Sequence, residues 1–381
     1  MKIKSDFTVF IGENGCGKSE ILSQLSRIYA SNGQDVIAIA HCIHDKFDEQ
    51  LCKKKNFDFL GARLGSEMTK VALREVIKAF SKKNESNSIL SQVFEYVGYE
   101  PSIGISIEFN DFSLDSLPTR LSKSKSSIIR HSDVVGLIRS YNLTHGSDNL
   151  IWFDFNYRDY STFANINYNE LIIFEKELVD VGVIKEIRYF LRKGGEVLNI
   201  EKASSGELYQ IANISYIASK IKKNSVIFID EPENSLHPKW QKEYIGKLFN
   251  FFSLYYPRFV LATHSPLILS SLNLNHDDAD YSRGLDCSIY KVEKFKVEEL
   301  SHSEKNVENI LWNMFGVITP ENNFLSNFLV ELINKLNERN INLDYTLNHI
   351  DNLYENATDP RQRSVIKEVR KIALNLASGR L

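Results

Sequence analysis

The sequence predicts an α/β protein with a mainly parallel sheet, a helical or mixed insertion and an all-helical C-terminal region. Three observations indicate this class. A strand, a loop, a helix and a second strand follow one another within residues 7–42, which is the spacing of a βαβ unit. Two later runs, at 225–230 and 258–265, are almost wholly apolar, as strands of a covered parallel sheet are. Beyond about residue 300 the pattern is helical only.

The N-terminal unit consists of three segments. The apolar run Phe7–Gly12 predicts a short strand, and Asp35–Cys42 predicts a second one. Between them, the stretch from Lys18 to about Ala30 predicts an amphipathic helix. Its apolar face carries Ile21, Leu22, Leu25 and Ile28. Because two parallel strands need a crossover, this helix is expected to cover one face of the sheet.

The middle of the chain mixes both kinds of element. β-rich composition predicts strands at 103–112 and 149–157. Helical periodicity predicts helices at 66–83, 88–98 and 168–194, the last open to a break at the interior Gly182.

Two parts are therefore expected. The first is a head over residues 1–300, with the insertion at about 50–150. The second is a helical region over 301–381, which suits partner docking or assembly. Its helices are predicted at 305–316, 321–340, 343–357 and 360–376.

The composition is that of an ordinary globular protein. Hydrophobic residues make up 43% and charged residues 25% of the 381 residues. The net charge of −3 does not favour binding of the whole chain to a polyanion such as nucleic acid. Basic clusters at 52–56, 120–130, 220–223 and 361–371 are interpreted as solvated surface, although nucleic acid stays open as a partner. The four cysteines show no metal spacing, and no apolar run reaches the roughly 18 residues of a membrane span. We expect a cytoplasmic protein without membrane segments.

One segment carries the strongest chemical signal. The run GENGCGKS, Gly12–Ser19, matches G-x-x-x-x-G-K-[ST] between a strand and a helix, which is the context of a phosphate-binding loop. Its glycines let backbone N–H groups surround phosphate, and the helix N-terminus adds a positive dipole. Lys18 is expected to reach the β- and γ-phosphates of ATP, and Ser19 to bind Mg²⁺. The nucleotide-binding residues are then Gly12, Asn14, Gly15, Cys16, Gly17, Lys18 and Ser19.

Acidic residues at a strand end supply the second half of the predicted site. The run SVIFID ends at Asp230, and Glu231 follows, at the edge where open α/β sheets bind ligands. Asp230 suits Mg²⁺ or its bound water, while Glu231 can orient and deprotonate the attacking water. His264 follows another apolar strand. It is interpreted as a γ-phosphate contact, with a turn or capping residue as the alternative.

A Ser-Gly turn at a predicted helix N-terminus completes the set. It lies at Ser204–Glu207, between the phosphate loop and the acidic strand. In this position it resembles the signature motif of ABC-class ATPases, which contacts the γ-phosphate of ATP held by the other subunit. The resemblance implies that Ser204, Ser205, Gly206 and Glu207 complete a site in trans. The run ENSLHPKWQ looks like the D-loop, and its SLHP form is similar to the SMC/RecF/OLD branch.

Other segments are interpreted as structural. The acidic stretch 275–286 lacks the context of a Toprim domain and is read as a loop, and no heptad arm of the SMC type is expected. The run HCIHD, His41–Asp45, is read as core and loop residues rather than a metal site. The aromatic residues at 152–160 are read as a core face rather than a base-stacking surface. Neither a Q-loop glutamine nor an adenine-stacking aromatic is assigned.

The layout is also similar to ATPase subunits of bacterial antiphage systems of the Septu, PARIS and retron-associated types. This resemblance implies an ABC-class ATPase that binds and hydrolyses ATP with Mg²⁺ and dimerises head to head on ATP. It also implies control of a separately encoded effector, a nuclease or toxin. Two alternatives stay open: a RecF-like repair ATPase that binds DNA, and a nucleotide-locked scaffold with little turnover.

Overall fold

The computed structural model describes residues 3–48, 50–65, 67–80, 87–123, 131–144, 150–156, 168–234, 236–269, 286–300, 323–356 and 360–377. The chain forms two compact units, one over Met1–Thr8 with Ser19–Ala262 and one over Val9–Lys18 with Thr263–Leu381. In the ranges just given, no helix has both the length and the apolar character that a bilayer crossing requires.

The larger sheet has the strand order β11-β10-β1-β9-β8-β2-β3. Strand β2 pairs in parallel with β3 and β8, and β8 pairs in parallel with β9. Its strands are β1 (Phe7–Ile11), β2 (Val36–Ala40), β3 (Phe57–Gly61), β8 (Val226–Asp230), β9 (Arg258–Thr263), β10 (Cys287–Glu293) and β11 (Lys296–Glu299). The predicted α/β class with a mainly parallel sheet is therefore confirmed, as are the four strands predicted from apolar runs.

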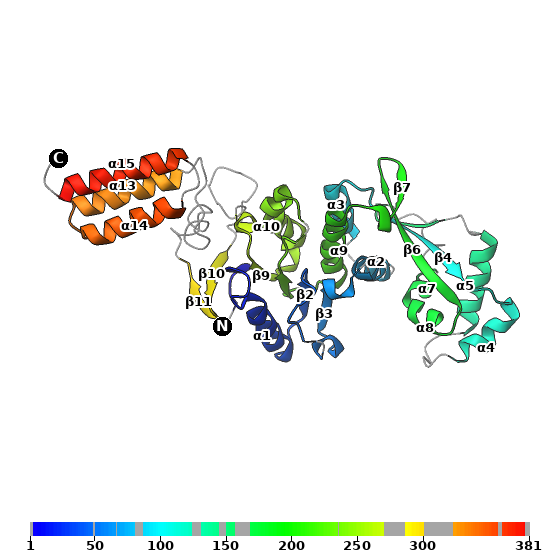
Figure 1. Cartoon of the computed structure of the whole chain (residues 1–381). Coiled ribbons are helices and arrows are strands. Elements are labelled where there is room, and N and C mark those ends of the chain that lie inside the picture. The colour runs from blue at the N-terminus through cyan, green and yellow to red at the C-terminus, as the bar shows by residue number, and fades with distance from the viewer. Residues whose placement is uncertain are drawn as a thin grey trace. The chain divides into compact units, whose positions relative to one another are not determined.

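Helices cover both faces of the parallel strands in the first unit. Helix α1 (Lys18–Ser31) and helix α10 (Pro238–Phe252) lie on opposite sides of these strands (Figure 1). Helix α9 (Ser205–Lys220) packs against β2 and β3 and is covered by α2 (Glu67–Phe80) and α3 (Asn87–Val97). In α1, Leu22 and Leu25 are buried as expected, but Ile28 is half exposed. The apolar face of α1 is narrower than predicted.

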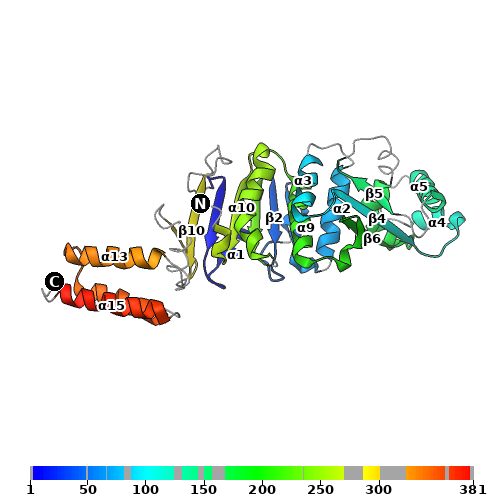
Figure 2. The ribbon, with the colours of Figure 1, turned by 90° about the horizontal axis from the view of Figure 1, so that it is seen from above.

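A second, inserted sheet is antiparallel throughout. Its strands lie between residues 102 and 199, so it begins within the insertion predicted at about 50–150 and extends beyond it. Its strand order is β5-β4-β6-β7, with β4 paired to both β5 and β6 (Figure 2). The strands are β4 (Ser102–Phe109), β5 (Ile151–Asp154), β6 (Ile184–Lys193) and β7 (Glu196–Asn199). The accompanying helices are α4 (Leu117–Leu121), α5 (His131–Thr144), α7 (Asn169–Ile173) and α8 (Glu175–Asp180). Short helices elsewhere are Leu51–Lys53, Ala62–Leu64, Leu114–Ser116, Ile200–Lys202, Ser253–Tyr255 and α11 (Pro266–Leu269).

The helix predicted at 168–194 is wrong in its second half. Helices α7 and α8 end before Gly182, whose φ of 70° suits a glycine, and β6 follows. Ile187, Tyr189 and Leu191 are buried while Arg188 between them is exposed, which is the alternation of a strand with one covered face. Ile184, Ile187 and Leu191 also have the separations of three and four residues that are typical of a helix face, which is why the pattern predicts a helix here.

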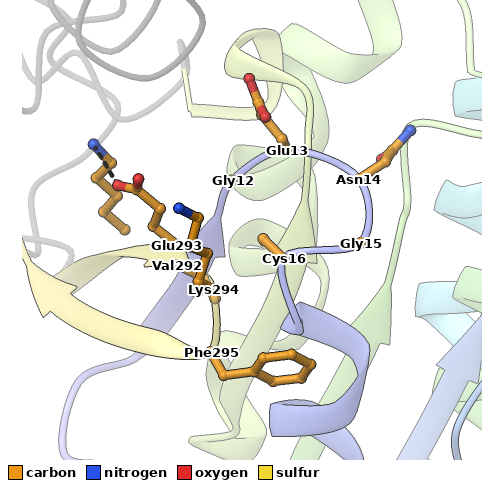
Figure 3. Close-up of a pocket in the computed structure, with 10 residues that line it drawn as sticks. Gly12, Glu13, Asn14, Gly15, Cys16, Val292, Glu293, Lys294 and Phe295 are labelled. Atoms are coloured by element: carbon orange, nitrogen blue, oxygen red, sulfur yellow. Dashed lines mark ion pairs between the residues drawn. The ribbon is translucent and has the colours of Figure 1, made fainter.

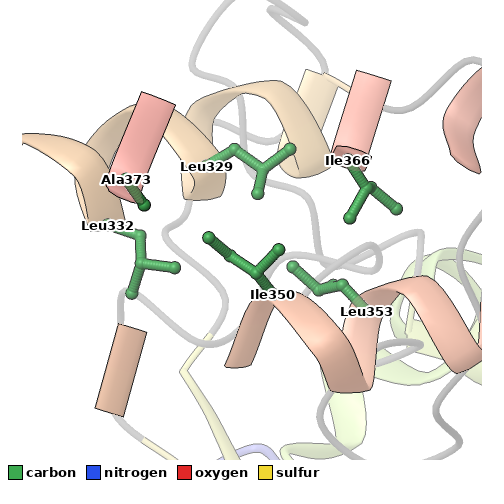
Figure 4. Close-up of a cluster of buried hydrophobic side chains, with 6 residues drawn as sticks. All are labelled: Leu329, Leu332, Ile350, Leu353, Ile366 and Ala373. Carbon is green, nitrogen blue, oxygen red and sulfur yellow. The ribbon is translucent and has the colours of Figure 1, made fainter. Parts of the chain in front are cut away.

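The C-terminal part of the second unit contains a hairpin and a helical bundle. The hairpin pairs β10 with β11 in antiparallel register, and the sequence analysis did not predict it. Helices α13 (Asn323–Asn337), α14 (Leu343–Asn356) and α15 (Pro360–Ala377) pack around a core of their own. Figure 4 shows its buried side chains, which are Leu329, Leu332, Ile350, Leu353, Ile366 and Ala373. The helix predicted at 305–316, most of 275–286, and residues 157–160 lie outside the described residues.

Candidate functional site

The backbone of the phosphate loop surrounds the side chain of Lys18. Gly15 and Gly17 have φ angles of 78° and 107°, which side chains other than glycine rarely adopt. The ammonium of Lys18 donates hydrogen bonds to the carbonyls of Gly12, at 2.9 Å, and Glu13, at 2.8 Å. Because Lys18 is only 4% exposed, these carbonyls compensate a buried positive charge. A lysine held in this way lies where a phosphate cradled by the loop would be neutralised.

Ser19 and Asp230 come together although 211 positions separate them in the chain. The hydroxyl of Ser19 donates to Oδ1 of Asp230 at 3.0 Å. Asp230 ends β8 and is fully buried, so its carboxylate has a fixed position. A hydroxyl and a carboxylate oxygen at this separation are the hard ligands that Mg²⁺ prefers, with waters and phosphate oxygens as the remaining ones. The pair therefore fits the predicted metal.

Glu231 adopts a backbone conformation that is unusual for its type. Its φ is 52°, in the left-handed region, and its N–H donates to the carbonyl of Ala262 at 2.8 Å. The side-chain amide of Asn234 donates to Oε2 of Glu231 at 2.9 Å. Glu231 thus leaves the end of β8 at a sharp angle and has one carboxylate oxygen held by a neighbour. The sequence analysis missed Asn234, whose position three residues after Glu231 in a turn is the signal that could have indicated it.

His41 is a second residue that the sequence analysis did not place at the site. Its Nδ1 donates to the backbone carbonyl of Asp230 at 3.1 Å, and its Nε2 accepts from the side-chain amide of Asn213 in α9. Burial lowers the pKa of His41 to about 4, although the Asp230 carbonyl and the charge of Glu233 oppose that shift. The neutral imidazole therefore connects the end of β8 to the helix that begins at the signature-like turn. Residue types alone predict neither the position of His41 beside Asp230 nor its two hydrogen bonds.

The signature-like turn opens α9. Ser204 takes the N-cap position, and Ser204 and Ser205 are both exposed. The carboxylate of Glu207 accepts from the hydroxyl of Tyr99 and from Lys193, both at 2.7 Å. Burial alone would raise the pKa of Glu207, but these two hydrogen bonds outweigh it and lower the pKa. Lys193 belongs to β6, so the turn is tied to the inserted sheet.

A cavity of about 600 Å³ lies over this turn. The turn forms one wall, and the N-terminus of α10 forms the other. The lining residues are Ser204, Ser205, Gly206, Glu207, Leu236, His237, Lys239 and Trp240. Exposed hydroxyls and backbone N–H groups at a helix start, next to a lysine, suit an anionic group.

His264 and the loop residues Gly12–Lys18 belong to the second unit, while Ser19, Asp230, Glu231 and the signature-like turn belong to the first. His264 follows directly on β9 and is half buried. It lies in a turn that is stabilised by a hydrogen bond, which the N–H of Ser265 donates to Oγ1 of Thr263 at 2.9 Å. Within the part of the chain that the structure describes, no group of three or more His, Cys, Asp or Glu side chains is arranged as a metal site. The roles of all these residues stay predictions.

A strand, a phosphate loop and a helix, followed by an acid-ended parallel strand, define the class of P-loop nucleotide-binding α/β proteins. The chain belongs to the family described as "AAA domain, putative AbiEii toxin, Type IV TA system", whose model matches residues 55–270.

Two relatives agree with the predicted resemblance to ATPases of antiphage systems. The "Retron Vc95 probable ATPase" of Vibrio cholerae is 22% identical over 348 residues, which cover 70% of this chain and 67% of that one. The "Septu protein PtuA" of Bacillus mycoides is 25% identical over 297 residues, covering 71% of this chain and 37% of that one. This chain therefore spans little more than a third of the Septu protein. VirB4 of Thermoanaerobacter pseudethanolicus aligns over 83% of both chains, at 9% identity and a TM-score of 0.28, a likeness too low to carry a conclusion.

Proposed function

We propose that this chain is an ATPase that binds and hydrolyses ATP with Mg²⁺, closes head to head with a second copy on ATP, and controls a separately encoded effector in antiviral defence. The observation that carries the hydrolytic part is the 3.0 Å bond between Ser19 and Asp230, with Glu231 next to it in a constrained conformation. Binding of the metal needs the hydroxyl of Ser19 and the carboxylate of Asp230, and activation of the attacking water needs the second carboxylate, that of Glu231.

Each residue has one task in the proposed reaction. Lys18 exchanges its two carbonyl partners for phosphate oxygens and neutralises charge on the β- and γ-phosphates. Ser19 and Asp230 would hold Mg²⁺, which when bound would supply positive charge against the charge that develops on the phosphates. Glu231 accepts a proton from the attacking water, and Asn234 fixes which carboxylate oxygen faces that water. His264 contacts the γ-phosphate.

The second copy supplies what one chain lacks. Exposed hydroxyls and N–H groups at the start of α9 would meet the γ-phosphate held by the partner copy. A single chain would then bind ATP and turn it over slowly, because half of the stabilising field around the γ-phosphate is missing. ATP occupancy becomes an assembly switch, since binding energy favours the closed pair and hydrolysis releases it.

Control of an effector rests on the relatives and on the bundle. Both relatives carry names of defence systems. The bundle of α13, α14 and α15 has its own core and also exposes apolar side chains, which suits contact with another protein. The nuclease or toxin is the effector class that the resemblance implies.

One of the two basic clusters that the DNA-repair alternative requires is partly neutralised by neighbouring acids. This alternative needs the lysines at 220–223 on a basic surface, but Lys220 is paired with Glu75 and Asp58, and Lys222 with Asp35. Two of the three lysines in this cluster are therefore paired with acids of the same chain.

Glu231→Gln tests the catalytic assignment. We expect ATP turnover to fall by about a hundredfold or more, because a general base contributes about that much, while ATP binding persists. The measurement is steady-state phosphate release together with native mass in the presence of ATP, which should show a longer-lived dimer. Glu196→Gln, an exposed carboxylate in the β6–β7 hairpin, is the matched control and should leave turnover unchanged. Negligible wild-type turnover that Glu231→Gln does not change would instead support the nucleotide-locked scaffold.

Co-purification tests the effector. The chain is expressed with its genomic neighbours, and native mass is recorded with and without ATP. A complex with a neighbouring nuclease or toxin that ATP alters is expected. Dimerisation that requires both ATP and DNA, with strong salt dependence and no captured neighbour, would contradict effector control and favour the repair ATPase.

A further inference from the structure

A second cavity, of about 510 Å³, lies between the phosphate loop and the β10–β11 hairpin (Figure 3). Five consecutive loop residues, Gly12–Cys16, form one side, and five consecutive hairpin residues, Lys291–Phe295, form the other. Its size is in the range of small-molecule sites. All of its lining belongs to one compact unit.

The hairpin turn has a backbone that its sequence does not favour. Glu293 pairs with Lys296, so the turn consists of Lys294 and Phe295 alone. Both have left-handed backbones, with φ of 48° and 65°, where two-residue turns usually have Asn-Gly. An aromatic residue in this region is an outlier that its surroundings must maintain. Here the N–H of Phe295 donates to the carbonyl of Cys16 at 2.9 Å, which fixes the turn against the loop.

The Phe295 ring contacts the phosphate loop, but most of its surface is not buried by that contact. A Cβ on Gly17 would come within 2.5 Å of the ring, so the ring lies directly against the loop backbone at Gly17. Nevertheless Phe295 is 67% exposed. Figure 3 shows the ring below Cys16. Packing on Gly17 therefore leaves most of the Phe295 side chain exposed next to the phosphate loop.

The polar groups near the ring suit a nucleoside. Lys294 is exposed at the same turn, and Lys291 forms an ion pair with Glu293 at 3.5 Å on the cavity wall. Stacking on an aromatic ring is how proteins hold bases of any sequence, because every base has a π-face. Phosphates bound by Gly12–Lys18 would leave the remaining part of the nucleotide within reach of this wall.

We propose that the β10–β11 turn is the base-binding wall of the nucleotide site, and that Phe295 stacks on the base of the nucleotide whose phosphates the loop holds. This rests on the proposed function, since it presumes that the loop binds a nucleoside triphosphate. The ligand class is a nucleoside triphosphate, with its base on the ring and its phosphates in the loop. The competing interpretation is that Phe295 only braces Gly17 and the loop.

Two ligands separate these interpretations. ATP carries phosphates and a base, whereas inorganic tripolyphosphate carries phosphates alone. If Phe295 stacks on the base, Phe295→Ala should weaken ATP binding by between about fivefold and a hundredfold and leave tripolyphosphate binding unchanged. Calorimetric titration of the full chain with each ligand measures both. An equal loss for the two ligands, or no loss for ATP, would overturn the assignment.

Three further variants make the result specific. Phe295→Tyr keeps an aromatic ring and should restore ATP affinity, whereas Phe295→Leu keeps an apolar side chain against Gly17 without an aromatic face and should not. Tyr256→Ala is the matched control, because Tyr256 is another exposed aromatic residue with a left-handed backbone, φ 51°, at the end of a short helix in the other unit. It should change neither affinity. If the wild-type chain binds neither ATP nor tripolyphosphate, the proposed function itself fails, which differs from every outcome for Phe295.

Discussion

At the scale of single residues, the carboxylate of Glu231 is held by its backbone and by one amide. The left-handed φ of 52° turns the residue out of the strand direction, and Asn234 holds Oε2 at 2.9 Å. A general base is effective only when its free lone pair faces the proton it accepts. In the proposed reaction Asn234 is thus a positioning residue, which acts through Glu231.

Replacing Asn234 should separate positioning from binding. In Asn234→Ala the carboxylate of Glu231 gains rotational freedom, so kcat should fall by about ten- to a hundredfold, a part of what the base itself contributes. The KM for ATP should change little, because Asn234 donates to a carboxylate and not to the loop. Asn234→Asp, which cannot donate and adds a negative charge, should be no better than the alanine variant. Steady-state kinetics measure both constants.

The matched control is Asn340→Ala. Asn340 donates to Oε2 of Glu338 at the same 2.9 Å, on an exposed turn of the bundle. Its removal should leave kcat unchanged. A fall in kcat of similar size in both variants would show that Asn234 matters only for general stability.

At the scale of elements, three segments of the first unit meet at one charged cluster. Lys220, the last residue of α9, contacts Glu75 of α2 at 2.6 Å and Asp58 of β3 at 3.4 Å. Burial alone would raise the pKa of Glu75, but the hydrogen bonds and charges of Lys220 and Lys78 outweigh it and lower the pKa. For Lys220, burial acts to lower the pKa, and the two acids together raise it. The cluster therefore ties the helix that carries the signature-like turn to its neighbours.

The sign of the pH dependence follows from these directions. The folded pKa of Glu75 lies below its ordinary value of 4.5, so its stabilisation is complete above that pH and is lost as the pH falls through the folded pKa. The folded pKa of Lys220 lies above 10.5, so its contribution is complete below that pH and is lost at higher pH. Glu75→Gln should cost roughly 1–2 kcal/mol at neutral pH and flatten the acid limb of the stability curve.

Chemical denaturation at several pH values measures this effect. Glu331→Gln is the control, since Glu331 forms an exposed pair with Lys335 in the bundle, worth about 0.5 kcal/mol or less. An acid limb for Glu75→Gln with the same slope as the wild type would contradict the assignment.

The same elements show what sequence patterns can predict. Strands buried on both faces are continuous apolar runs, so β1, β2, β8 and β9 were predicted close to their observed bounds. A strand with one covered face, such as β6, has an alternation that adjoining apolar residues can mask. The β10–β11 hairpin has neither Asn nor Gly in its turn, so the usual signal was missing. The partners of Asp230 depend on residues 189 and 211 positions away, which local patterns cannot relate.

At the scale of the whole molecule, the proposed site is complete only with two copies. The loop and the acids of one chain would receive the turn at Ser205 and Gly206 from the other. An isologous pair then contains two such sites. This arrangement predicts that two inactive variants recover ATP turnover when they are mixed, which a site formed within a single chain would not do.

Lys18→Ala removes the phosphate ligand, and Ser205→Arg blocks the turn, so each variant alone should be inactive. When the two are mixed, half of the pairs are mixed pairs, and each of these retains one site made of an intact loop and an intact turn. ATP turnover should therefore recover to about a quarter of the wild-type value, if the two sites of a pair act independently. Phosphate release measured on the equilibrated mixture tests this.

The control mixes Lys18→Ala with the double variant Lys18→Ala/Ser205→Arg. Both carry the loop defect, so no pair has an intact loop and turnover should stay at the background of either chain. Recovery only in the first mixture requires that the turn acts on the loop of the other copy. If the first mixture is no more active than its separate components, Ser205 does not complete the site in trans. The turn would then act within its own chain, where it lies beside the N-terminus of α10.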